Sequence, residues 1–143
     1  MIFVLDTNVL SEAVDPRPDP GVAAWLRAQR PTSLFTTTVC QAEILAGIAI
    51  MPPGARRSNL LEATHTMFSD VFQNRVLGFD AASAIEYAEM FAGRRRSGKP
   101  VDMADTMIAA IARVHQAAVV TRNTRDFDGC GVDVVNPWDE PVT

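Results

Sequence analysis

Cysteine is scarce in this sequence: only Cys40 and Cys130 occur among 143 residues, and they form no CxxC pair. Two cysteines cannot build a disulfide framework, so stability must come from a hydrophobic core, which a hydrophobic fraction of 48% allows at this length. No apolar run approaches the roughly 18 residues of a membrane span, and the first residues lack the basic segment of a signal peptide. We therefore expect a cytoplasmic protein without membrane contact, folded as one domain over residues 1–143.

Lysine is scarcer still, because Lys99 is the one lysine among 13 cationic residues and the rest are arginines. The net charge of −4 argues against a broad basic surface for nucleic acid, although binding depends on local groups of charge. Arginine suits phosphate contacts, solvated helix ends and carboxylate partners alike. The arginines form three local groups: Arg56-Arg57, Arg94-Arg95-Arg96, and Arg122 with Arg125. For the first two groups we favour a structural role, at helix ends or beside carboxylates, over phosphate binding.

Several motifs that carry chemistry are missing. Neither GxGxxG nor GxxxxGK[ST] occurs, which leaves no glycine-rich phosphate loop, and no GxSxG turn or cysteine–histidine neighbourhood indicates covalent catalysis. The only histidines, His65 and His115, lie in helical patterns and give zinc chemistry little support.

Short apolar segments alternate with helical patterns along the chain, which predicts an α/β fold with a parallel sheet covered on both faces. The predicted strands are Ile2–Leu5, Leu34–Thr37, Val76–Phe79, Ala118–Thr121 and Val132–Val135. The predicted helices cover Val9–Val14, Gly21–Arg30, Val39–Ile50, Arg56–Gln73, Ala81–Arg96 and residues 102–116. Because such sheets place their sites beyond the carboxyl ends of the strands, the residues that follow the strands matter most.

Most of the reactive residues after the strands are acids. Asp6 follows the first strand directly; a helix N-cap is the alternative role for it. Glu43 lies about two turns into a helix of largely apolar residues, which predicts burial and a need for a cation, a metal or a raised pKa.

Asp105 lies in the first turn of a helix that is apolar nearly all round and is therefore a core element. A capping box, in which Asp102 caps the helix and Asp105 reaches back, is the alternative. The polar cluster Thr121–Asp126 follows the fourth strand and is also compatible with a simple turn. Acids that converge at one sheet edge stay ionised together only beside a cation, and oxygen ligands favour Mg²⁺ or Mn²⁺. A metal-dependent hydrolase of phosphate esters fits this inventory.

Four segments occur in an order that resembles the PIN-domain family, specifically its VapC-type toxins and their FitB-like members. They are the apolar strand with Asp6-Thr7-Asn8, the helical Ala42-Glu43, Asp105-x-x-Ile108-Ala109-Ala110, and Thr121-Arg122-Asn123-x-x-Asp126-Phe127. The late Asn136-Pro137-Trp138 also resembles that group, and the resemblance covers essentially the whole chain.

The resemblance implies a three-layer α/β/α fold with a five-stranded parallel sheet and a Mg²⁺- or Mn²⁺-dependent endoribonuclease, commonly aimed at tRNA or rRNA. Asp6, Glu43 and Asp105 fall on the family's metal-site positions. The fourth position is often Asp in the family and is Asn123 here, with Asp126 nearby as a second source of charge. The remaining motif residues are expected to support the acids: Thr7, Asn8, Thr121 and Arg122.

The resemblance also implies partners. Such toxins are usually homodimers held by a cognate VapB-type antitoxin, which itself binds operator DNA. A surface for self-association is expected on the helix that runs from Ala81 to Phe91, with Ile85 and Ala88 on it.

Two other functions stay open at this point. A phosphohydrolase of the haloacid-dehalogenase type also begins with strand–Asp–x–Asp, but Asn8 stands where its second acid belongs and only Lys99 is available near a phosphate. A catalytically inactive RNA-binding module with the same fold is the other, and the retained trio Asp6, Glu43 and Asp105 argues against it.

Overall fold

The computed structural model describes residues 1–139, and within them five strands form one parallel sheet in the order β3-β2-β1-β4-β5. The strands are β1 (Phe3–Leu5), β2 (Leu34–Thr37), β3 (Val76–Leu77), β4 (Ala118–Val120) and β5 (Val134–Val135). The predicted parallel sheet is confirmed.

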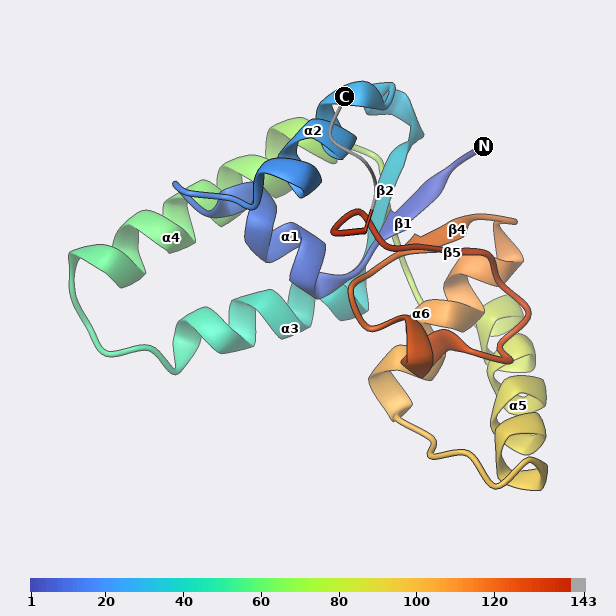
Figure 1. Cartoon of the computed structure of the whole chain (residues 1–143). Helices are drawn as coiled ribbons and strands as arrows, with labels where there is room; N and C mark the ends of the chain where they lie inside the picture. The colour runs from blue at the N-terminus through green and yellow to red at the C-terminus, as the bar shows by residue number, and fades with distance from the viewer. Residues whose placement is uncertain (140–143) are drawn as a thin grey trace.

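Helices cover both faces of the sheet, which confirms the three-layer α/β/α architecture. Figure 1 shows α1, α3 and α4 on one side of the strands and α5 and α6 on the other. The six α-helices of the described residues are α1 (Thr7–Val14), α2 (Pro20–Ala28), α3 (Thr38–Ala49), α4 (Ala55–Thr66), α5 (Ala81–Arg96) and α6 (Met103–Val114). No helix within residues 1–139 has both the length and the apolar character to cross a membrane.

The structure corrects several predicted boundaries. The helix expected over Arg56–Gln73 ends as α4 at Thr66 and continues as one π-helical turn, Met67–Val71. The strand expected to reach Phe79 stops at Leu77, because Leu77 pairs with Thr37, the last residue of β2, after which the chain enters α3. Two short 3₁₀ helices were not assigned from the sequence: η1 (Pro31–Ser33) and η3 (Thr124–Phe127).

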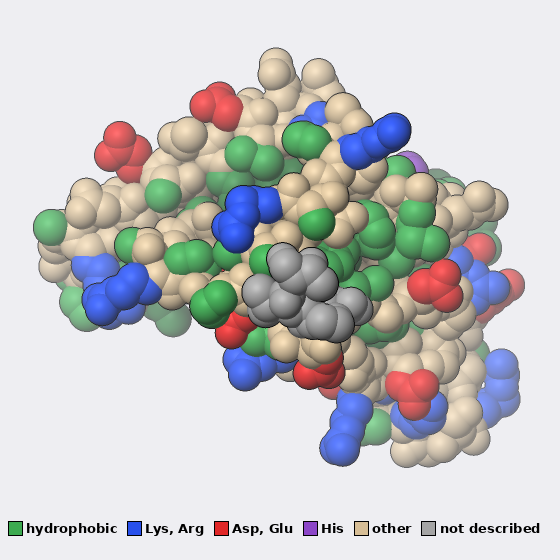
Figure 2. All heavy atoms as spheres, turned by 45° about the horizontal axis from the view of Figure 1, so that its top comes forward, with side chains coloured by type: hydrophobic (Ala, Val, Ile, Leu, Met, Phe, Trp, Pro, Cys, Tyr) green, Lys and Arg blue, Asp and Glu red, His purple; other side chains and the backbone are tan. Residues whose placement is uncertain are grey.

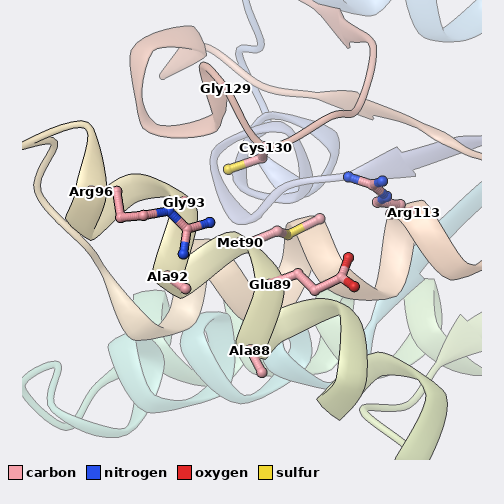
Figure 3. A pocket seen from close by; sticks show the side chains of 9 residues that line it. All are labelled: Ala88, Glu89, Met90, Ala92, Gly93, Arg96, Arg113, Gly129 and Cys130. Carbon is pink, nitrogen blue, oxygen red and sulfur yellow. The ribbon is translucent and has the colours of Figure 1, made fainter.

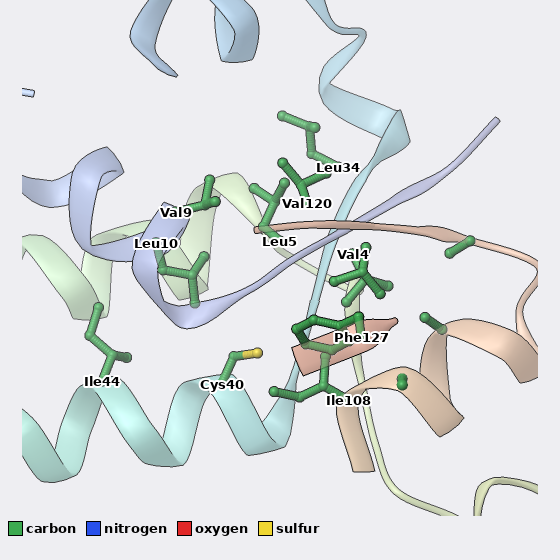
Figure 4. Packing of buried hydrophobic residues seen from close by; sticks show 14 of the residues in the cluster. Val4, Leu5, Val9, Leu10, Leu34, Cys40, Ile44, Ile108, Val120 and Phe127 are labelled. Atoms are coloured by element: carbon green, nitrogen blue, oxygen red, sulfur yellow. The ribbon is translucent and has the colours of Figure 1, made fainter. Parts of the chain in front are cut away.

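The core lies between the sheet and these helices. Val4 of β1 is fully buried, and Figure 4 shows Phe127 of η3 and Ile108 of α6 close to it. On the other side, Ile44 of α3 points toward Leu10 of α1. Apolar side chains on both faces of the central strands therefore fix where α1, α3 and α6 begin relative to the sheet.

The strand register aligns the ends of β1, β2 and β4. Leu5 pairs with Val120, and the Asp6 N–H donates to the Val120 carbonyl at 2.9 Å. The Thr36 hydroxyl of β2 donates to the Leu5 carbonyl at 2.8 Å. As a result, the residues that leave β1 and β4, Asp6 and Thr121, emerge at the same edge of the sheet.

Candidate active site

Asp6 is held in place by hydrogen bonds from several directions. It caps α1, where its Oδ1 accepts the Thr7 backbone N–H at 2.8 Å. Its Oδ2 accepts the Thr121 hydroxyl at 2.7 Å and, more weakly, the Asn8 amide at 3.5 Å. Burial raises the pKa of Asp6, while the bonds from Thr121 and Thr7 oppose that shift by favouring the charged form. The N-cap role and the site position considered from the sequence therefore coincide in one residue.

Glu43 reaches the same edge from α3. Its Oε1 accepts the Thr7 hydroxyl at 2.7 Å, so Thr7 links the two acids, through its N–H to Asp6 and through its hydroxyl to Glu43. The prediction that Glu43 is buried is wrong, because α3 turns Cys40 and Ile44 inward and leaves Glu43 exposed. An exposed carboxylate needs no counter-charge to stay ionised, but it is accessible to one.

Asp105 lies in the first turn of α6 and is half-buried. The Asp105 N–H donates to Asp102 Oδ1 at 2.9 Å, so Asp102 caps the helix. Among the hydrogen bonds of residues 1–139, none is accepted by the Asp105 carboxylate, and the capping box is therefore only half formed. Partial burial raises the pKa of Asp105 to about 7, and the negative charges of Asp102, Asp6, Asp126 and Glu43 add to the shift. These acids act on one another electrostatically.

A network joins the start of α1 to the segment after β4. The Asn8 amide donates to Thr121 Oγ1 at 3.2 Å, and the Arg122 N–H donates to Asn8 Oδ1 at 3.2 Å. The Asn123 N–H donates to Thr121 Oγ1 at 3.0 Å. Three of the four residues expected to support the acids, Asn8, Thr121 and Arg122, are thus joined by hydrogen bonds, and the Thr121 hydroxyl links them to Asp6.

Asn123 and Asp126 are less firmly placed. Both are exposed, on the N-cap and in the body of η3, and neither side chain takes part in a hydrogen bond among the described residues. Asp126 nevertheless adds its charge to the rise in pKa of both Asp6 and Asp105. It faces the cluster closely enough to act on it, whereas Asn123 contributes only its backbone.

Cys40 is the residue that the sequence did not single out. Its Sγ lies 4.0 Å from Asp6 Oδ1, and ligand atoms of Asp6, Cys40 and Glu43 all lie within 4.8 Å of one another. Burial raises the pKa of the Cys40 thiol to about 11, and the charge of Asp6 adds to the shift. At neutral pH it is a weak donor to Asp6. The signal that could have found it is the spacing from Glu43, three residues along one helix.

The donor set fits a hard divalent cation. Asp6, Glu43 and Asp105 offer carboxylate oxygens, which Mg²⁺ and Mn²⁺ prefer, and each carboxylate keeps lone pairs beyond the hydrogen bonds described above. Burial is the main cause of the raised pKa of Asp105, and the neighbouring negative charges add to it. Asp105 itself lies outside the group of ligand atoms within 4.8 Å of one another, which comprises Asp6, Cys40 and Glu43. His65 and His115 are both exposed and stand outside the ligand group of the described residues.

A separate cavity of about 590 Å³ lies between α5, α6 and the loop after η3. Figure 3 shows Arg96 and Arg113 on opposite sides of it, with Glu89 and the Cys130 sulfur between them. Arg113 is paired with Glu86 at 3.1 Å. None of the predicted site residues lines this cavity, so it is distinct from the acid cluster.

Two of the cationic residues considered from the sequence, Arg94 and Lys99, are engaged away from the acid cluster. Arg94 is buried, with its guanidinium donating to the carbonyls of Pro100 and Asp128, which confirms the structural role favoured for it. Lys99 pairs with Asp128 at 3.3 Å rather than with a site carboxylate. On the face seen in Figure 2, basic side chains are spread among acidic ones instead of forming one basic field.

Comparison with known proteins identifies the family to which the chain belongs. The family described as PIN domain matches residues 3–130. This chain belongs to the PIN-domain family. It is 41% identical over 138 residues to the plasmid stability protein StbB of Pseudomonas syringae pv. tomato, covering 96% of this chain and 99% of that one. The VapC ribonuclease Y4jK of Sinorhizobium fredii is 38% identical with the same coverage.

The fold of this PIN domain also matches a solved complex. The structure of FitAB bound to the IR36 DNA fragment superposes with a TM-score of 0.91 at 34% identity and covers 98% of both chains. The resemblance of the sequence to VapC-type, FitB-like PIN domains is therefore confirmed. The acid cluster lies at the carboxyl edge of the PIN-domain sheet, where strand ends from β1 and β4 and helix starts from α3 and α6 meet.

Proposed function

We propose that this PIN domain is a Mg²⁺- or Mn²⁺-dependent endoribonuclease toxin of a toxin–antitoxin pair, which hydrolyses phosphodiester bonds in tRNA or rRNA in the cytoplasm. One observation supports the proposal: Asp6 and Glu43 offer ligand atoms within 4.8 Å of each other at the carboxyl edge of the sheet, Thr121 and Thr7 hold Asp6 in position, and the charges of both acids act on Asp105. The VapC ribonuclease relative at 38% identity supports RNA as the substrate.

The residues of the chain have separable roles in this proposal. When bound, Mg²⁺ or Mn²⁺ activates water for in-line attack and stabilises charge on the phosphate. Asp6, Glu43 and Asp105 would hold the ion. Thr7 keeps the two first acids in register through its backbone and hydroxyl bonds. Asp126, exposed beside the cluster, is positioned to orient a water at the rim, and Asn123 can offer a carbonyl oxygen without adding charge.

Asp6→Asn tests the proposal. We expect the variant to lose RNA cleavage and growth arrest while it keeps its fold, because the amide removes charge from the best-ordered ligand. Mg²⁺ should raise the Tm of the wild type by mass action and should leave the Tm of Asp6→Asn nearly unchanged. Asp70→Asn, an exposed acid in the π-helical turn, is the matched control. A fully active Asp6→Asn protein would refute the assignment.

The same assay separates the other two functions. Equal RNA binding in EDTA and in Mg²⁺, with no cleavage in either, would establish an inactive RNA-binding module. An acid-stable phosphoenzyme would establish a haloacid-dehalogenase-type phosphohydrolase, which uses its first aspartate as a nucleophile. The pairing of Lys99 with Asp128 disfavours that second function, since its phosphate-binding lysine is engaged.

The proposed partners follow from charge and from exposed apolar residues. A cluster of acids on a chain of net charge −4 attracts a basic segment of a VapB-type antitoxin, with an arginine directed at the carboxylates; DNA is contacted only through that antitoxin. On α5, Ile85 is 66% and Phe91 38% exposed, which suits a homodimer surface. Light scattering should give a dimer at micromolar concentration, and a monomer alone would remove this part of the proposal.

A further inference from the structure

Arg122 is a cation fixed at the rim of the acid cluster. It follows Thr121 directly, and its backbone N–H donates to Asn8 Oδ1. The Asn8 amide donates to Thr121, whose hydroxyl donates to Asp6, so hydrogen bonds through these two residues link Arg122 to Asp6. Its guanidinium carbon lies 5.2 Å from the centroid of the Trp138 ring. The side chain is nevertheless exposed, so its outer N–H groups face solvent.

Trp138 is itself anchored. It is partly buried against the hydrophobic core, and its backbone N–H donates to Asn136 Oδ1 at 3.0 Å. An aromatic face attracts a guanidinium and leaves the planar fork of N–H donors free to meet an anion. The late Asn136-Pro137-Trp138 segment therefore holds the Arg122 side chain in one orientation before any ligand arrives.

The acids around Arg122 do not neutralise it. Within residues 1–139 the ion pairs are Lys99–Asp128 and Arg113–Glu86, and Arg122 belongs to neither. An acid cluster repels a polyanion, so RNA that approaches the site needs a nearby cation to offset that repulsion. A fixed guanidinium at the rim supplies it, with bidentate geometry that matches a phosphate.

We propose that Arg122, held on the face of Trp138, binds an RNA phosphate next to the one that is cleaved and so positions the strand over the carboxylates. This proposal rests on the ribonuclease function proposed above. Trp138 is a positioning residue that acts through Arg122. The pair gives a role to the Arg122 side chain, of which the acid site uses only the backbone N–H, and to Trp138 near the end of the described chain.

The test compares Arg122→Gln and Arg122→Lys with Arg95→Gln. Arg95 is the matched control because its guanidinium also lies over an aromatic ring, that of Phe91 at 5.8 Å, but on α5. For Arg122→Gln we expect KM for RNA to rise about tenfold with kcat unchanged, because a contact made equally in ground and transition states is lost. The slope of log affinity against log salt should fall by about 0.7 to 0.9, the loss of one phosphate contact.

The remaining variants divide charge from geometry. Arg122→Lys should keep the salt slope of the wild type, with a KM between those of the wild type and Arg122→Gln. Trp138→Leu should raise KM without changing the salt slope, because the charge of Arg122 remains but is no longer oriented. Arg95→Gln should match the wild type in both. Because a structural role alone would lower Tm without changing the salt slope, an unchanged slope in a folded Arg122→Gln protein would overturn the proposal.

RNA binding measured by fluorescence anisotropy in EDTA keeps this test independent of catalysis. If the wild type binds RNA but never cleaves it, the proposed function fails while the Arg122 contact is still measured. If Arg122→Gln binds RNA as the wild type does and instead loses affinity for a basic or acidic antitoxin peptide, Arg122 is a protein contact and the RNA proposal is wrong.

Discussion

The strand side and the helix side of the acid cluster are built differently. Asp6, at the end of β1, is 4% exposed and accepts hydrogen bonds from Thr7, Thr121 and Asn8. Asp105, at the start of α6, is half-buried, and its carboxylate accepts no hydrogen bond among the described residues. Burial raises both pKa values, but only Asp6 has donors that favour its charged form. One acid is therefore fixed in advance, and the other is left to be neutralised by a proton or a cation.

Glu43 lies between these extremes, exposed but tied to the Thr7 hydroxyl at 2.7 Å. The residue at the strand edge, Asp6, is therefore held in one position by hydrogen bonds, whereas the carboxylates on the helices have fewer hydrogen bonds to hold them. A site built in this way holds its geometry without a metal, yet it gains most from one. Variants on the two sides should therefore fail in different ways.

The largest expected effect comes from loosening the rigid side with Thr121→Val. Valine has nearly the same shape but removes the 2.7 Å hydrogen bond to Asp6 Oδ2. We expect the pKa of Asp6 to rise further and RNA cleavage to fall about 10- to 100-fold, as for other residues that orient metal ligands. Kinetics on one RNA substrate check this, with the exposed Thr124→Val as the control. Wild-type activity in Thr121→Val would show that the orientation of Asp6 is immaterial.

A smaller effect should follow from removing the charge on the adjustable side with Asp105→Asn. The pKa of Asp105 is raised from 3.8 to about 7, so the folded protein binds a proton that the unfolded chain has released between these values. Without metal, wild-type stability from this group therefore falls as pH rises from about 4 through 7. Asp105→Asn lacks that loss and should be about 1–2 kcal/mol more stable than wild type at pH 8, after a reduction for solvent screening of a half-exposed group.

Denaturant unfolding in EDTA at pH 5 and pH 8 measures this difference, which should grow with pH. Saturating Mg²⁺ should reduce or reverse it, because the cation then stabilises the charged form of Asp105. Asp102→Asn is a poor control because the charge of Asp102 itself raises the pKa of Asp105; the exposed Asp133→Asn serves instead. If the difference in unfolding free energy between wild type and Asp105→Asn stays constant across pH, the pKa of Asp105 is not raised in the folded protein.

The sequence was sufficient to predict the sheet and the location of the acids, since Asp6 follows an apolar strand and parallel strand ends meet at one edge. It was not sufficient for the exposure of Glu43, because apolar residues occur all round α3 and its buried face, with Cys40, Ile44 and Ile48, is scarcely more apolar than its exposed face. Cys40 was missed for the same reason: a cysteine in an apolar helix is indistinguishable from an ordinary core residue. The contact of Arg122 with Trp138 depends on the parallel pairing of β5 with β4, which brings the segments after both strands together and which no local pattern encodes.

The smallest effect should come from η3, which lies between the two sides. Asn123→Asp adds a carboxylate beside the cluster, and one extra charge about 8 Å from a divalent ion in water-like surroundings contributes about 1 kcal/mol, or roughly fivefold tighter Mg²⁺ binding. Asp126→Ala should lower turnover more than stability, because its exposed carboxylate makes no hydrogen bond among the described residues but acts on the charge of Asp105. Calorimetry of Mg²⁺ binding without RNA checks the first, with Asn59→Asp on α4 as the control. With three carboxylates the wild type should hold one ion tightly and a second weakly. Two equally tight sites would mean that asparagine in place of aspartate at position 123 does not weaken metal binding.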